Sequence, residues 1–120
     1  MFNVDKEIKI VLQFIHFRFK NCDIDFHFLI KKTKVLYFKV KDQFDFVNQK
    51  WVYLTCCFII LKFVNDENIY NSAWSRNFEI PLQVLNDMEC KILNYINYEL
   101  YKIIFKPNSV LLLKNFFHNL

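Results

Sequence analysis

The chain of 120 residues contains no glycine. Glycine is the residue that adopts left-handed backbone conformations, and lets a backbone approach a ligand closely, without steric penalty. Phosphate-binding loops, dinucleotide-binding turns and the nucleophile elbow of hydrolases need such backbone, so the sequence excludes these three motifs. A helical chain without glycine must end its helices on other residues. Asparagine is the usual substitute, and the candidates are Asn21, Asn65 and Asn77.

The composition is that of one folded domain with a mixed surface. Hydrophobic residues make up 54% of the chain, which is enough to form a core. The net charge is +4, from 16 basic and 12 acidic residues. Arginine, which reads bases and phosphates bidentately, occurs only at Arg18 and Arg76. The composition therefore argues against nucleic acid as the partner.

The residues that usually carry catalysis or bind metals form no recognisable pattern. No CxxC pair occurs among the four cysteines, which are Cys22, Cys56, Cys57 and Cys90. Their spacing matches neither a zinc site nor a disulfide framework, so we expect reduced, buried thiols. The three histidines are scattered and suggest no nucleophile–base pair. We therefore expect no enzymatic activity, no metal and no other cofactor.

No segment has the pattern of a membrane span or a signal peptide. The longest uncharged run covers residues 51–61, which is about half of the roughly 20 residues that a bilayer requires. Charged residues occur from Asp5 onward, before any apolar run. We expect an intracellular protein, cytoplasmic or nuclear.

The spacing of apolar residues predicts an all-α fold. Helices are expected over residues 5–20, 25–41, 51–61, 67–78, 81–101 and 107–120. The third of these is apolar nearly all round and belongs in the middle of a bundle, with Asn48 as a candidate cap. A buried β-strand is the rival interpretation, but the run is long for a strand and its neighbours are helical. We expect a bundle of five helices, this central one included, over residues 1–106, and a short C-terminal helix over residues 107–120 packed on them.

The second predicted helix carries lysines on the side opposite its apolar stripe. They are Lys31, Lys32, Lys34, Lys39 and Lys41. Such a face is typical of a nucleic-acid or membrane patch, or of the solvated side of an amphipathic helix. We prefer the solvated side.

Two charged residues lie where apolar ones are expected. Glu89 interrupts the apolar stripe of the fifth helix, and Lys62 ends the most apolar helix of the chain. A charge beside a buried face costs several kcal/mol unless it is paired or partly hydrated. Together the two residues suggest an ion pair at the rim of the core between the third and fifth helices. The alternative is that both point to solvent.

Parts of the third and fifth helices resemble the cyclin box. Residues 54–63 (Leu-Thr-Cys-Cys-Phe-Ile-Ile-Leu-Lys-Phe) are similar to the third cyclin-box helix with its Lys-Phe end. Asp66, Asn71 and Trp74 follow the D…N…W/Y spacing of the family. Residues 85–89 (Leu-Asn-Asp-Met-Glu) resemble the opening of its fifth helix. Within the family, the sequence is most similar to cyclin Y and the phosphate-pathway (Pho-type) cyclins, over residues 44–120.

The resemblance implies a regulatory subunit that binds and allosterically activates a cyclin-dependent protein kinase. In the family, the third-helix lysine and the fifth-helix glutamate face the kinase, and Lys62 and Glu89 match those positions. Lys62, Phe63 and Glu89 are therefore the expected kinase-binding residues. Residues that mark the core of the cyclin box are Trp51, Trp74, Leu85 and Leu93.

The chain departs from the family in its second helix. Cyclin boxes usually carry an acid–arginine pair late in that helix, where this chain has residues 35–38 (Val-Leu-Tyr-Phe). The departure removes an internal salt bridge and leaves the surface of the third and fifth helices in place. The alternative function is a degenerate cyclin-fold adaptor that binds a transcription complex or nucleic acid without activating a kinase.

Overall fold

The computed structural model describes residues 6, 9–11, 13, 26–64 and 69–104, and every regular element within these ranges is a helix. The elements are α2 (Phe26–Val40), the 3-10 helix η1 (Lys41–Phe44), α3 (Gln49–Val64), α4 (Asn71–Phe78), α5 (Leu82–Tyr95) and α6 (Leu100–Ile104). The expected all-α class is confirmed. Residues 6, 9–11 and 13 are helical, as predicted for the first helix, whose other residues lie outside the described ranges. The predicted C-terminal helix also lies outside them.

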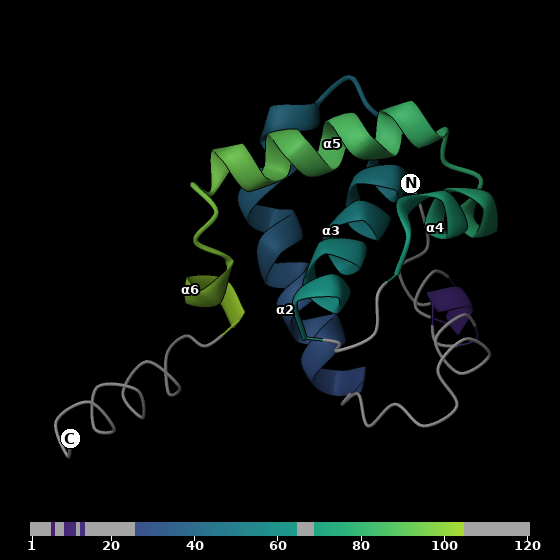
Figure 1. Cartoon of the computed structure of the whole chain (residues 1–120). Helices are drawn as coiled ribbons and strands as arrows, with labels where there is room; N and C mark the ends of the chain where they lie inside the picture. Colours follow the sequence, from purple (N-terminus) through teal and green to yellow (C-terminus); the bar gives the residue numbers. More distant parts are fainter. Residues whose placement is uncertain (1–5, 7–8, 12, 14–25, 65–68, 105–120) are drawn as a thin grey trace, which may run out of the picture.

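The apolar helix α3 forms the centre of the fold. Every residue from Val52 to Leu61 is buried. In Figure 1, α2 runs alongside α3 and α5 crosses both, with α4 at the start of α5. α3 packs against α2, α5 and η1. A helix with no polar face is stable only when neighbours cover it on all sides, and this arrangement meets that requirement.

Helix α2 packs against α3 through buried residues that are about one helical turn apart. Leu29, Thr33, Leu36 and Val40 are buried, at intervals of four, three and four residues. The Thr33 hydroxyl is satisfied within the helix, because its Oγ1 donates to the Leu29 carbonyl at 2.7 Å. The stripe therefore buries no unpaired hydroxyl at this position.

One of the five lysines predicted on the outer side of the second helix is not on the solvated side. Lys32 is only 9% exposed, so its placement among the outer lysines was wrong. It lies one turn from both Leu29 and Leu36, which puts it on the edge of the buried face. Its ammonium lies over the Phe28 ring, 5.7 Å from the centroid. Burial, with a smaller effect of Lys31, lowers the pKa of Lys32.

The connection from α2 to α3 is held by Gln49. The Tyr37 hydroxyl donates to Gln49 Oε1 at 2.8 Å, and Gln49 Nε2 donates to the carbonyls of Phe44 (2.8 Å) and Val47 (3.2 Å). The predicted cap is also present, because the Lys50 amide donates to Asn48 Oδ1 at 3.0 Å. These bonds fix where α3 starts.

Helix α4 ends at Phe78 as predicted, but it starts later and its left-handed residue differs from the predicted one. It begins at Asn71, and Ile69 and Tyr70 are not helical; Glu67, the predicted start, lies outside the described ranges. At the other end, Glu79 is left-handed with φ 56° and its amide donates to the Ser75 carbonyl. Asn77 remains within the helix, so the prediction that it would take the left-handed position was wrong. Asn21 and Asn65 lie outside the described ranges.

Helix α5 ends at Tyr95, not near Tyr101 as predicted. Asn97 and Tyr98 both have positive φ (55° and 57°), and the Tyr98 amide donates to the Leu93 carbonyl at 2.8 Å. This turn breaks the apolar stripe into two helices and redirects α6, which packs against α2. The continuous periodicity of residues 85–100 concealed the break.

The cysteines differ in their environment. Cys56 and Cys57 are buried in α3, as expected, whereas Cys90 is exposed on α5. The expectation that it would be buried was wrong, because position 90 follows Glu89 onto the outer side of the helix. Within the described ranges, no helix combines the length and apolar character needed to cross a membrane.

Candidate functional site: a polar network joining three helices

Lys62 and Glu89 form the predicted ion pair. Lys62 lies in the last turn of α3 and Glu89 in the middle of α5, and Lys62 Nζ is 3.0 Å from Glu89 Oε2. Their side chains are 34% and 19% exposed. The pair therefore lies at the rim of the core, where water still reaches both charges.

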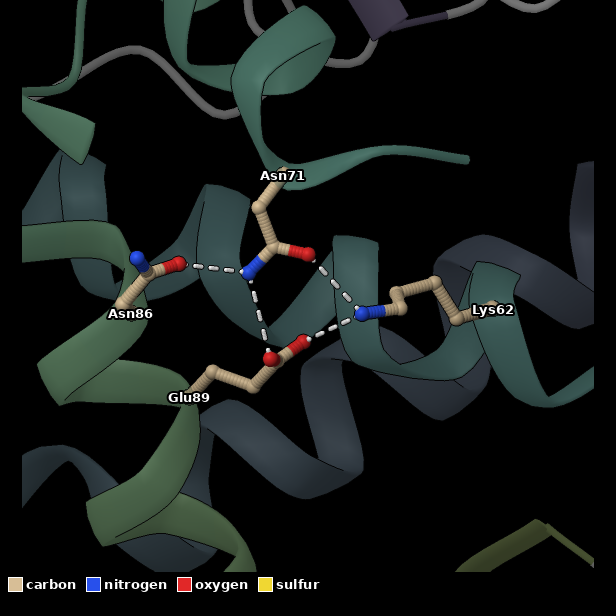
Figure 2. A network of polar contacts seen from close by, with 4 residues as sticks. All are labelled: Lys62, Asn71, Asn86 and Glu89. Carbon is tan, nitrogen blue, oxygen red and sulfur yellow. Dashed lines mark hydrogen bonds and ion pairs between the residues drawn. The ribbon is translucent and has the colours of Figure 1, made fainter. Parts of the chain in front are cut away.

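Asn71, the first residue of α4, joins this pair from a third helix (Figure 2). Its Oδ1 accepts a hydrogen bond from Lys62 Nζ at 3.0 Å, and its Nδ2 donates to Glu89 Oε1 at 3.2 Å. The same Nδ2 donates to Asn86 Oδ1 at 2.7 Å. We call Lys62, Asn71, Asn86 and Glu89 the polar network. It links α3, α4 and α5 through side chains alone.

Helical spacing explains how the network forms on α5. Asn86 and Glu89 are three residues apart, so they project from the same side of the helix. The buried residues Leu85, Met88 and Ile92 lie on the adjacent side, against α3. Glu89 is thus carried to the rim of the core by the residues that anchor α5.

An aromatic stack between α3 and α4 lies next to the network. The Phe58 ring of α3 stacks on Trp74 of α4 at 5.0 Å, and Trp74 contacts Phe78 at 4.3 Å. Asn71, Trp74 and Phe78 recur at helical spacing, so the stack that fixes α4 also orients Asn71. Lys62 Nζ lies 4.6 Å from the centroid of the Phe58 ring, a cation–π distance.

The hydrogen-bonding groups of the network are not all used internally. Asn71 Nδ2 donates to both Asn86 and Glu89, so its two protons are engaged. Glu89 Oε1 accepts a hydrogen bond from Asn71 and Oε2 accepts one from Lys62, and each oxygen can accept a further bond. In Figure 2 the Asn86 amide nitrogen points away from Asn71. An incoming group could therefore bond to Glu89 and Asn86 while the network stays intact.

The other predicted residues fall into two groups. Phe63, next to Lys62, is 48% exposed, so part of its ring is on the surface. Among the core markers, Trp74 and Leu85 are fully buried, whereas Trp51 and Leu93 are partly buried and pack against the core. The structure thus brings Lys62 and Glu89 together, and Phe63 follows Lys62 in α3.

Two members of the network were not predicted as site residues. Asn71 and Asn86 appeared in the sequence only as parts of the cyclin-like D…N…W and L-N-x-M-E patterns. Both are polar residues in helices, and the spacing of apolar residues does not distinguish a polar residue of a site from one that simply faces solvent. The patterns themselves were the available signal, since each asparagine lies three residues before Trp74 or Glu89.

The buried thiols have low reactivity at neutral pH. Burial raises the pKa of Cys57 to about 12, partly offset by a hydrogen bond to Thr33. Burial, and then the neighbouring Cys57, raises the pKa of Cys56 well above its ordinary value. Both groups are therefore neutral thiols at neutral pH, and a neutral thiol is a poor nucleophile. Across the described ranges, no three His, Cys, Asp or Glu side chains are grouped so that they could hold a metal ion.

Comparisons with known proteins identify no relative. No family model, no curated protein and no solved structure matches the chain.

Proposed function

We propose that this chain is a cyclin-like regulatory subunit that binds a cyclin-dependent protein kinase of the type that partners cyclin Y or the Pho-type cyclins. The observation that carries the proposal is the Lys62–Glu89 ion pair across α3 and α5. These two residues stand at the positions where the cyclin box, which the sequence resembles, faces its kinase. The exposed part of Phe63 adds an apolar contact beside the charges, and a mixed polar and apolar surface suits a docking interface.

The proposed mechanism is allosteric. The surface around the polar network would pack on the mobile αC helix of the kinase. Docking would bring the αC glutamate to the lysine of the ATP site, which shifts the kinase toward its active conformation. The chain itself would contribute no reacting group, because its task is to hold a rigid surface against a mobile helix.

The second candidate is an adaptor that keeps the cyclin fold without activating a kinase. Residues 35–38 of α2, where cyclin boxes usually carry an acid–arginine pair, favour this candidate. Such an adaptor would bind a transcription complex or nucleic acid. Added salt separates the two: contacts to phosphates weaken steeply with salt, whereas a largely apolar kinase interface changes little.

The experiment that tests the proposal is affinity capture of the tagged full chain from its native cells, followed by mass spectrometry. We expect a cyclin-dependent kinase in the wild-type sample. Recovery of no kinase, under conditions in which a control cyclin retains its own, would overturn the kinase proposal. Recovery of transcription or nucleic-acid complexes instead would support the adaptor.

A charge swap then tests whether the polar network is the docking site. Lys62→Glu/Glu89→Lys still allows an ion pair between positions 62 and 89, but it exchanges the charges that α3 and α5 present to a partner. We expect its unfolding free energy to stay within about 2 kcal/mol of wild type, because a partly hydrated ion pair remains while the cation–π contact to Phe58 is lost. Kinase affinity should fall at least about tenfold, because reversed charges oppose the complementary ones on the partner. Unchanged kinase affinity in the swapped variant would place the docking site elsewhere.

A further inference from the structure

The outer side of α2 is a second exposed surface. It carries three lysines, Lys31, Lys34 and Lys39, and two apolar residues, Val35 and Phe38, all of which are exposed. We call these five residues the α2 outer face. α2 packs against α3, η1 and α6, whereas the polar network joins α3, α4 and α5. The two surfaces therefore belong to different helices.

Apolar side chains lie in the middle of the α2 outer face. Val35 is 45% exposed and Phe38 is 62% exposed. At 100° per residue, Lys31, Val35 and Phe38 lie within a sector of about 60°, and Lys34 and Lys39 lie on its two edges. An apolar centre with a charged surround is the usual arrangement of a protein interface.

No described residue neutralises the lysines of this face. Lys31, Lys34 and Lys39 form no ion pair with any residue of the described ranges. Asp42, exposed in η1, is the acidic residue that continues the stripe at its C-terminal end. The face thus presents a net positive charge around its apolar centre, and its electrostatic complement is acidic.

The residues of this face favour a protein partner over nucleic acid. Lys41 Nζ lies over the Phe38 ring, 5.2 Å from its centroid, and the Tyr37 ring lies 5.5 Å away. Phe38 is 62% exposed beside these groups, so an apolar side chain of a protein segment can cover the remaining ring surface. The cations of the face are lysines and not arginine, the residue that pairs bidentately with phosphates and bases. A second copy of this chain would bring the same lysines against each other, which is unfavourable.

A lipid surface fits the α2 outer face less well than an acidic protein segment. Amphipathic helices bind membranes by inserting a wide apolar face. The wide apolar face of α2 is buried against α3, through residues such as Leu29, Leu36 and Val40. Only Val35 and Phe38 would remain to insert, whereas two such side chains are enough to anchor a peptide whose charges match the lysines.

We propose that the α2 outer face binds an acidic, amphipathic segment of a partner protein. Its apolar side chains would cover Val35 and Phe38, while its carboxylates would pair with Lys31, Lys34 and Lys39. This site is independent of the proposed kinase-docking surface, because it uses a different helix and requires no residue of the polar network.

The test uses a designed peptide as a probe of this chemistry. A fluorescent helical peptide of about 18 residues carries leucines at positions i, i+3, i+4 and i+7 and glutamates on both flanks. A scrambled peptide of the same composition is its control. We expect the full chain to bind the designed peptide by fluorescence anisotropy, to bind the scrambled one more weakly, and to lose affinity as salt is added.

Variants locate the binding site of the peptide. Lys31→Glu/Lys34→Glu and, separately, Phe38→Ser should each weaken peptide binding at least about tenfold, with circular dichroism confirming the fold. Lys91→Glu/Lys102→Glu changes the net charge equally on α5 and α6 and should leave the affinity near the wild-type value. Lys31→Glu/Lys34→Glu should also leave kinase capture unchanged, which separates this proposal from the kinase proposal.

Three results would overturn the proposal. One is that the designed peptide does not bind. Another is that it binds equally well to Lys31→Glu/Lys34→Glu and to Phe38→Ser. The third is tighter binding, through the same lysines, of oligothymidylate or of phosphatidylserine-containing vesicles, which would assign the face to nucleic acid or to a lipid surface.

Discussion

At Lys62, one ammonium group meets three partners of different kinds. It lies 3.0 Å from both Glu89 Oε2 and Asn71 Oδ1, and 4.6 Å from the centroid of the Phe58 ring. Each contact alone contributes about 1 kcal/mol or less at an exposed site. Acting from three directions, they restrict the side chain to one position. The three contacts therefore fix where the Lys62 ammonium lies, although each of them stabilises the fold only weakly.

The thiol of Cys57 predicts how stability depends on alkaline pH. Its pKa rises from an ordinary value of 9.0 to about 12 because of burial. In the unfolded chain the thiol releases its proton from about pH 9 upward, whereas in the folded chain it keeps the proton until about pH 12. The unfolded state therefore gains stability in this window as pH rises.

We expect Cys57→Ala to reduce the alkaline loss of stability. Between about pH 8 and about pH 10, the thiol should remove about 1.4 kcal/mol from the unfolding free energy of the wild type, and this loss should disappear in the variant. Urea denaturation at the two pH values measures it. Cys90→Ala, at the exposed cysteine, is the matched control and should keep the wild-type loss. Equal losses in Cys57→Ala and wild type would show that Cys57 ionises while folded.

At the scale of the helices, residues other than glycine adopt the left-handed conformations that turns and helix ends require. Within the described ranges, the residues with positive φ are Glu79, Asn97 and Tyr98. A left-handed residue with a side chain costs roughly 1–2 kcal/mol, less for asparagine. Glu79 is therefore a strained position that ends α4, and Asn97 is where asparagine takes the place of glycine.

Glycine at position 79 should stabilise the protein. Glu79→Gly removes the steric penalty at φ 56° and should raise the unfolding free energy by about 0.5–1 kcal/mol after the entropy of the unfolded chain is included. Asn77→Gly, two residues earlier and inside α4, should lower it by roughly 0.5 kcal/mol. Thermal denaturation of both variants checks the opposite signs. Destabilisation by Glu79→Gly would mean that Glu79 makes contacts worth more than its strain.

At the scale of the whole molecule, α3 is the element on which the others depend. It packs against α2, α5 and η1, and Phe58 connects it to Trp74 of α4. Access to its buried residues therefore requires the surrounding helices to separate. Local opening of one neighbour exposes one side only.

Cysteine labelling follows from this arrangement. In a Cys22→Ser variant, N-ethylmaleimide should modify Cys90 under native conditions and modify Cys56 and Cys57 only after denaturation. Intact-mass spectrometry then shows one adduct before, and three after, the addition of urea. Rapid native labelling of Cys56 or Cys57 would contradict the central position of α3.

The sequence predicted the helices well where their faces were unambiguous. Residues 51–61 could only be central, because an apolar helix has no side for water. The Lys62–Glu89 pair was also predictable, since each charge was anomalous in its own helix. Predictions failed at boundaries and edges, such as Asn77 and the end of α5, where one turn decides between helix and left-handed backbone. Local spacing does not contain that information.

By itself, the sequence determined the all-helical class and the burial of the third helix. Periodicity and composition act locally, so they can be read without knowing which helices meet. Only the tertiary structure decided that Lys32 is buried, that Cys90 is exposed and that Asn71 joins Lys62 to Glu89. These outcomes depend on how α2, α4 and α5 pack around α3. Residues far apart in the chain set that geometry through the core that they share.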